Sequence, residues 1–188
     1  MILSLTLLVL PIVLEFLGGT AEAYHCSQTD LTTAAIEDCV NAVRTDPNAW
    51  TWYFYCGISG LSSAPALTLH SKLKSSAAGH AADMAGRGYI SHWGSNGSTL
   101  KERVWNSAGF GGNPIAENVA SGQKTAIDVI EGWMCSESHR KAMMSCDFNV
   151  MGIAMQCNSE KCFVAQNLGC FPEGSCSCDG KKAPPSYG

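Results

Sequence analysis

Ten cysteines in a chain of 188 residues are the feature that most constrains how this sequence can fold. An even number of cysteines is typical of a secreted domain held together by disulfides, because the cytosol keeps thiols reduced. The ten are Cys26, Cys39, Cys56, Cys135, Cys146, Cys157, Cys162, Cys170, Cys176 and Cys178. They allow on the order of a thousand complete pairings, so the connectivity stays open; Cys135–Cys146 and Cys157–Cys162 are two local pairs among the alternatives. Structural zinc is the less favoured alternative, because the sequence holds no paired C-x-x-C units.

An apolar leader precedes the first cysteine. Residues 3–17 are almost continuously apolar, and Ala21-Glu22-Ala23 follows as a site for signal peptidase. A membrane helix needs about 20 apolar residues, and this stretch is shorter and interrupted. We therefore predict that residues 1–23 are a cleaved signal peptide, that the protein is secreted to the extracellular space, and that it keeps no transmembrane segment. An uncleaved anchor is the alternative.

The remaining length suits one domain, since domains usually span about 100–200 residues. We expect this domain over residues 24–172, followed by a Cys-, Gly- and Pro-rich tail over residues 173–188. The net charge is −4, and no cluster of Lys and Arg exceeds the pair Lys181–Lys182. This charge pattern argues against nucleic acid or an anionic membrane as the main partner.

Hydrophobic periodicity predicts helices followed by a hairpin. Helical stripes cover residues 31–44 and 67–88, a capping box at Thr125-x-x-Asp128 opens a third helix with Trp133 inward, and a short fourth helix is expected over residues 136–144. Two apolar runs over residues 149–157 and 162–170 predict antiparallel strands. The aromatic run over residues 50–55 is of uncertain type, and residues 91–122 are predicted to be rich in loops. This order predicts an α+β fold in which helices pack on a small antiparallel sheet.

Four motifs in a fixed order resemble those of the CAP superfamily of cysteine-rich secretory, antigen 5 and pathogenesis-related proteins. They are AIEDCVNAVR (35–44), HAADMAGRGYISHWGSNGSTLKERV (80–104), IAENVASG (115–122) and EGWMCSESHRKAMM (131–144). The sequence is most similar to the bacterial-type, SCP-like extracellular branch. The resemblance implies a three-layer α-β-α sandwich, here stabilised by disulfides.

The same resemblance implies a cleft lined by His92, Glu117 and His139. The fourth cleft position of the animal branch is acidic, but here it is Ser136, with Glu137 next to it. Two neutral imidazoles and a carboxylate are a sound ligand set for zinc with an open position for water, so His92, His139 and Glu117 are the candidate metal ligands. The spacing of the three residues is not itself a metal signature, and the same residues can simply hold the shape of the cleft.

The implied function is extracellular binding of a sterol or fatty-acyl lipid or of a protein partner, with a divalent cation in the cleft as an option. No catalytic residues are assigned, because the sequence lacks both G-x-S-x-G and H-E-x-x-H. The alternative is a zinc-dependent hydrolase or peptidase in which Glu117 is the base. The one glycosylation sequon begins at Asn96. His80 carries no functional pattern of its own, and we expect a surface or packing role for it.

Overall fold

The computed structural model describes residue 24 and residues 26–178; the predicted signal peptide and the end of the predicted tail lie outside them. The described elements are α1 (Thr33–Thr45), η1 (Pro47–Trp50), β1 (Thr68–Leu69), α2 (Ser71–Arg87), η2 (Glu102–Ser107), β2 (Ile115–Ser121), α3 (Ala126–Cys135), α4 (Glu137–Met144), β3 (Val150–Cys157) and β4 (Cys162–Gly169). No described helix is long and apolar enough to cross a membrane.

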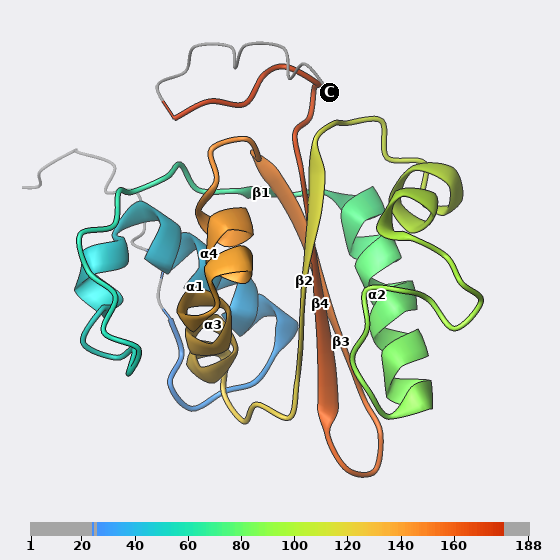
Figure 1. The fold of residues 1–188 in the computed structure, drawn as a ribbon, viewed down its shortest axis with the longest axis horizontal. Helices are drawn as coiled ribbons and strands as arrows, with labels where there is room; N and C mark the ends of the chain where they lie inside the picture. Colours follow the sequence, from blue (N-terminus) through green and yellow to red (C-terminus); the bar gives the residue numbers. More distant parts are fainter. Residues whose placement is uncertain (1–23, 25, 179–188) are drawn as a thin grey trace, which may run out of the picture.

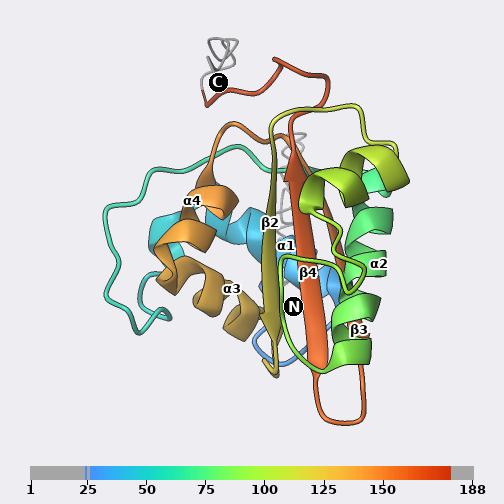
Figure 2. The same ribbon diagram turned by 45° about the vertical axis from the view of Figure 1, so that its right-hand side comes forward.

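The elements form three layers, as predicted. The sheet lies in the middle, α1, α3 and α4 cover one face, and α2 covers the other (Figure 1 and Figure 2). The strand order is β1-β3-β4-β2, in which β3 pairs antiparallel with β4 and β4 pairs antiparallel with β2. The short strand β1 adds a parallel edge beside β3, within a segment that the periodicity predicts to be helical.

Local chemistry sets the helix ends. The capping box predicted before α3 is confirmed, because the Thr125 hydroxyl accepts from the Asp128 amide and the Asp128 carboxylate accepts from the Thr125 amide. Helix α2 begins after His70, whose ring Nδ1 accepts from the Lys72 amide. It ends at Gly88, which takes the left-handed conformation with φ of 79°.

The small side chains of α2 let it lie close to the sheet. Ala77 and Ala81 are fully buried against strand residues that include Phe163. Gly152 of β3 faces the first turn of the helix, and a Cβ at this position would lie 2.0 Å from the Lys74 nitrogen. Helix and strand therefore approach to a distance that only glycine allows here.

The other face of the sheet carries the larger core, and Trp133 is its anchor, as predicted. Its side chain is 1% exposed, and its indole nitrogen donates to the Val119 carbonyl at 3.1 Å. The hydrogen bond joins α3 to β2. The orientation of α3 therefore depends on the strand that also carries Glu117.

All ten cysteines are paired, in the disulfides Cys26–Cys39, Cys56–Cys135, Cys146–Cys178, Cys157–Cys162 and Cys170–Cys176. The local pair Cys157–Cys162 is confirmed, and it closes the β3–β4 hairpin. The other local pair, Cys135–Cys146, is wrong. Helix α4 separates these two cysteines by about 12 Å of helical rise, beyond the reach of a disulfide.

The stretch predicted to be rich in loops contains two elements, η2 and β2. Strand β2 does not show the alternation of apolar and polar residues that is typical of a half-buried strand. It is covered on both sides and has a central run of four buried residues. Two of these, Glu117 and Asn118, are polar, so the strand does not look apolar in the sequence.

Candidate functional site

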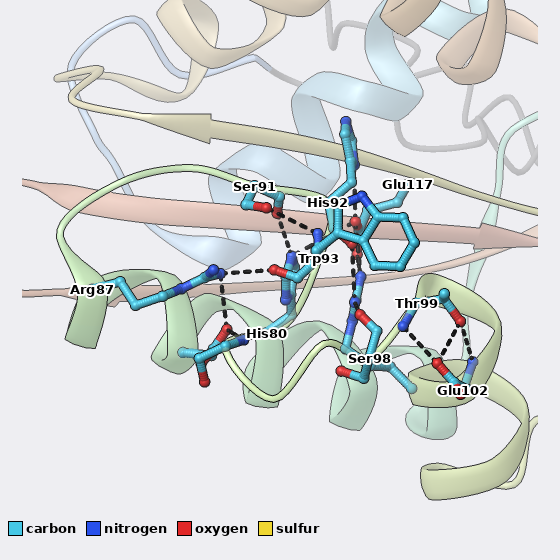
Figure 3. A network of polar contacts seen from close by, with 12 residues as sticks. His80, Arg87, Ser91, His92, Trp93, Ser98, Thr99, Glu102 and Glu117 are labelled. Carbon is cyan, nitrogen blue, oxygen red and sulfur yellow. Dashed lines mark hydrogen bonds and ion pairs between the residues drawn. The ribbon is translucent and has the colours of Figure 1, made fainter.

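Glu117 lies at the centre of a buried polar cluster between β2 and α2 (Figure 3). Its side chain is 2% exposed, and both carboxylate oxygens accept from one guanidinium nitrogen of Arg103, at 3.0 and 2.8 Å. The other terminal nitrogen of Arg103 donates to the carbonyls of His92 and Ser98. Arg103 therefore holds both the carboxylate and the loop that carries His92.

Two further side chains complete the cluster around Glu117. Asn167 faces Glu117 in the β2–β4 register, and its amide, oriented to satisfy its neighbours, donates to the second carboxylate oxygen at 3.1 Å. His80 extends from α2 with its Nε2 3.7 Å from Glu117 and 2.7 Å from the Ser91 carbonyl. Because a carbonyl can only accept, Nε2 carries a proton. Burial lowers the pKa of His80 and favours its neutral form.

His92 is the exposed member of the cluster. Its Nδ1 lies 3.0 Å from the Glu117 carboxylate, which can only accept, so Nδ1 carries the proton and Nε2 is free in the neutral ring. The side chain is 55% exposed. The hydrogen bond to Glu117 raises the pKa of His92. The buried carboxylate thus fixes the orientation of a ring that solvent can reach.

His139 lies on α4, a helix that contacts β2. The neighbouring strand residue Asn118 donates to the His139 carbonyl at 3.4 Å and to the Gln166 side chain at 2.9 Å, which ties α4 to the sheet. Burial lowers the pKa of His139, and the charge of a protonated His92 lowers it further.

Comparison with known proteins decides the family. A family model described as the cysteine-rich secretory protein family, CAP, matches residues 37–168. The chain belongs to the CAP family. The match includes the Glu117 cluster and all four layered helices except the first turn of α1.

Relatives of this CAP domain share part of its length. A protein of Bacillus subtilis (strain 168), YkwD, which is itself uncharacterized, is 33% identical over 91 residues, covering 46% of this chain and 34% of that protein. The aligned part thus spans about a third of the relative's length. Similar solved structures include an extracellular SCP-domain protein from Bacillus anthracis, with TM-score 0.58, 25% identity, and coverage of 73% and 40% of the two chains. An outer surface protein from Borrelia burgdorferi has TM-score 0.59, 18% identity, and coverage of 73% and 90%.

The five disulfides of this CAP domain fit a secreted protein, and the two structural neighbours are described as extracellular and outer-surface proteins.

Two predicted cleft residues have their own partners on α4. Glu137 has a 71% exposed side chain and pairs with Lys141 one turn along the helix, at 2.6 Å. Ser136 precedes α4, and its hydroxyl lies 3.4 Å from that of Ser138. These contacts do not connect either residue to His92 or Glu117, so their place in the cleft stays a prediction.

The expected three-ligand metal set is not assembled among the described residues, where no group of three His, Cys, Asp or Glu side chains could hold an ion. The physical reason is the state of Glu117, whose oxygens already accept from Arg103 and Asn167. The donor set that remains consists of two imidazoles. These residues do not fit a catalytic zinc centre with three protein ligands.

Sequence reasoning missed Arg103, His80 and Asn167. A sequence signal exists for His80, which lies on the same face of α2 as Ala77 and Ala81, where a polar residue must find a partner when it is buried. No such signal marks Arg103, because its burial follows from the tertiary structure.

A cavity of about 340 Å³ opens beside the cluster, lined by His92, Trp93, Thr99, Leu100 and Glu117. Trp93, at the edge of this cavity, is 60% exposed (Figure 3). The predicted glycosylation site lies in the following turn, where the exposed Asn96 side chain accepts from the Ser98 amide. The cavity is close to the lower limit of small-ligand sites, which usually hold about 300–1,000 Å³.

Proposed function

We propose that this CAP domain acts outside the cell by binding, and that the cavity beside His92 and Trp93 receives a side chain of a protein partner. One observation carries the proposal: a buried, fully engaged carboxylate holds an exposed imidazole in a fixed orientation beside an exposed indole. Exposed aromatic side chains with fixed polar neighbours are the usual anchors of protein interfaces.

The engagement of Glu117 argues against the hydrolase alternative. A general base needs a free lone pair within reach of the proton that it abstracts. Glu117 is instead 2% exposed and accepts from Arg103, Asn167 and His92. It acts as a positioning residue for His92 rather than as a base.

The lining of the cavity favours a protein side chain over a sterol or fatty-acyl chain. Only Trp93 and Leu100 are apolar among the five lining residues, whereas lipid ligands need a long apolar wall. A single aromatic or aliphatic side chain with a polar neighbour for His92 matches the volume and the mixed lining.

Selection of peptides displayed on phage tests this function. The secreted wild type should enrich peptides whose affinity falls about tenfold or more in Trp93→Ala and in His92→Ala, as expected for an interface anchor. Trp52→Ala is the matched control, because Trp52 is similarly exposed but lies in another layer, and it should bind like the wild type. A selection that enriches no peptide with a weaker affinity for Trp93→Ala than for the wild type would contradict the proposal. A stoichiometric lipid in native mass spectra, lost in Trp93→Ala, would assign the cavity to lipid instead.

A second candidate is a weakly held divalent cation, supported by the unprotonated Nε2 that the hydrogen bond to Glu117 leaves on His92, with His139 of α4 as the second ligand. A ring whose other nitrogen donates to a carboxylate is the usual arrangement of a ligating histidine, which would make Glu117 an outer partner rather than a ligand. Zinc should be preferred to calcium or magnesium, since the donors are imidazoles. Calorimetry at pH 7.5 and 5.5 should show weaker binding at the lower pH and none in His139→Ala. Equal zinc affinity in either comparison would place the ion elsewhere.

A further inference from the structure

A second exposed surface lies on the opposite side of the molecule from His92. It belongs to the aromatic loop, which we define as residues 50–56, beside α1 and α3, whereas the His92 loop lies beside α2 (Figure 1 and Figure 2). Trp52 is 69% exposed and Tyr55 is 91% exposed. Large aromatic side chains are mostly buried in globular proteins, so two neighbouring exceptions indicate an interaction surface.

The aromatic loop is held against α3 by two contacts, and two of its rings also pack on each other. Cys56 forms a disulfide with Cys135 at the end of α3. The Tyr55 amide donates to the Glu131 carboxylate at 3.1 Å. The rings of Trp52 and Tyr53 pack edge to face with their centroids 5.7 Å apart. The backbone of the loop is therefore held in place before a partner binds, which lowers the entropy that the loop loses on binding and favours recognition.

The aromatic loop and α3 carry acidic but no basic side chains. Residues 45–69 contain one charged side chain, Asp46, and α3 contributes Asp128 and Glu131 but no Lys or Arg. The Tyr53 hydroxyl lies 3.4 Å from the Asp128 carboxylate. Burial, followed by the charges of Asp128 and Glu131, raises the pKa of Tyr53. Tyr53 and Tyr55 thus lie next to the carboxylates of Asp128 and Glu131.

We propose that the aromatic loop and the acidic side of α3 form a docking surface for an arginine-bearing segment of an extracellular protein. A guanidinium stacks on Trp and Tyr faces and pairs with carboxylates in the same plane, so it uses both features of this surface together. The lack of Lys and Arg on the loop and on α3 leaves the carboxylates without a basic neighbour from these elements. An anionic membrane is disfavoured by the same charges.

An NMR titration of the full-length secreted protein tests the proposal. The probe is a synthetic nonapeptide with three Arg separated by Gly and Ser, and its matched analogues carry Lys or Glu at the three positions. The Arg peptide should shift the Trp52 indole resonance, the Lys peptide should bind more weakly, and the Glu peptide should not bind. Raising the salt from about 50 to about 300 mM should weaken the Arg peptide, because exposed charges are screened.

Variants locate the surface. Trp52→Ala and Tyr55→Ala should each weaken the Arg peptide by about three- to fivefold, the usual size of an exposed cation–π contact. Glu131→Gln keeps an acceptor for the Tyr55 amide but removes the charge, and it should weaken binding by a similar factor. Trp93→Ala is the matched control and should bind as the wild type does. Unchanged affinity in Trp52→Ala and Tyr55→Ala, or equal binding of the Glu peptide, would overturn the proposal. So would a shift of the Trp52 indole by phosphatidylcholine vesicles alone, which would make the loop a membrane contact.

Discussion

Replacing Arg103 should destabilise this CAP domain severely, because it would strand Glu117 as an unpaired carboxylate in the interior. The two side chains are 10% and 2% exposed, and the pair is joined by two hydrogen bonds. Breaking a buried ion pair by removing one partner costs about 3–5 kcal/mol. Arg103→Met keeps most of the apolar stem, so the measured loss in the free energy of unfolding reports the charge and its hydrogen bonds rather than a cavity.

A double-mutant cycle isolates the pair. Glu117→Met alone leaves an unpaired buried guanidinium and should cost a similar amount, whereas the double variant leaves neither charge behind. The double variant should therefore be less destabilised than the sum of the single variants, by about 2–3 kcal/mol. It should still lose the contacts of Arg103 with the carbonyls of His92 and Ser98.

Urea unfolding with the disulfides intact, followed by circular dichroism at pH 7.5, provides the measurement. The milder variant Glu117→Gln retains the side-chain shape and serves if the methionine variants do not fold. In Glu117→Gln the pKa of His92, measured by NMR, should fall, because the hydrogen bond to Glu117 is the main cause of its upward shift. Strict additivity of the two single variants, or an unchanged His92 pKa, would refute the reasoning.

Three other predictions concern the core, the disulfides and pH. Trp133→Ala should lower the free energy of unfolding by about 3–5 kcal/mol, since the side chain is 1% exposed; a change below about 1 kcal/mol would contradict its place in the core. Replacing Cys56 and Cys135 together by Ala should cost about 4–5 kcal/mol in urea unfolding, because the disulfide closes a loop with a sequence separation of 79. The pKa of His80 is lowered by burial, so its contribution to stability is complete above about pH 6.5 and is lost as the pH falls through the folded pKa, by up to about 1.4 kcal/mol per pH unit. The pKa of His92 is raised, so its contribution to stability is complete below about pH 6.5 and is lost as the pH rises through the folded pKa. Urea unfolding midpoints measured from pH 7.5 to 4.5 test the His80 prediction: they should depend less on acid in His80→Gln than in the wild type.

The sequence predicts the elements whose buried residues are apolar or whose ends carry a capping signal. Helix α2 shows its small-residue face, α3 shows its capping box, and the hairpin of β3 and β4 shows two continuous apolar runs. Strand β2 could not be recognised, because buried polar residues replace the apolar ones that a covered strand normally shows. What makes Glu117 acceptable there is Arg103, which reaches it from another part of the chain.

The candidate site is also predictable only in part, because it depends on contacts between distant parts of the chain. The motifs identify His92, Glu117 and His139, but not the way in which the carboxylate is used. Whether Glu117 serves as ligand, base or support depends on its hydrogen-bond partners, and these come from η2 and β4. The spacing of residues in the sequence does not predict these long-range hydrogen bonds. It does not predict the disulfide between Cys56 and Cys135 either.

The two exposed aromatic surfaces have different supports, which makes their functions separable. Trp93 depends on the cluster of Glu117 and Arg103 between the sheet and α2, and Trp52 depends on the disulfide that joins the aromatic loop to α3. The sheet lies between these two supports (Figure 1). Energetic effects at sites more than about 7–10 Å apart that share no partners usually add. Loss of the His92 and Trp93 contacts should therefore leave the arginine-binding surface intact, and a partner that touches both surfaces should show the product of the two single losses in affinity.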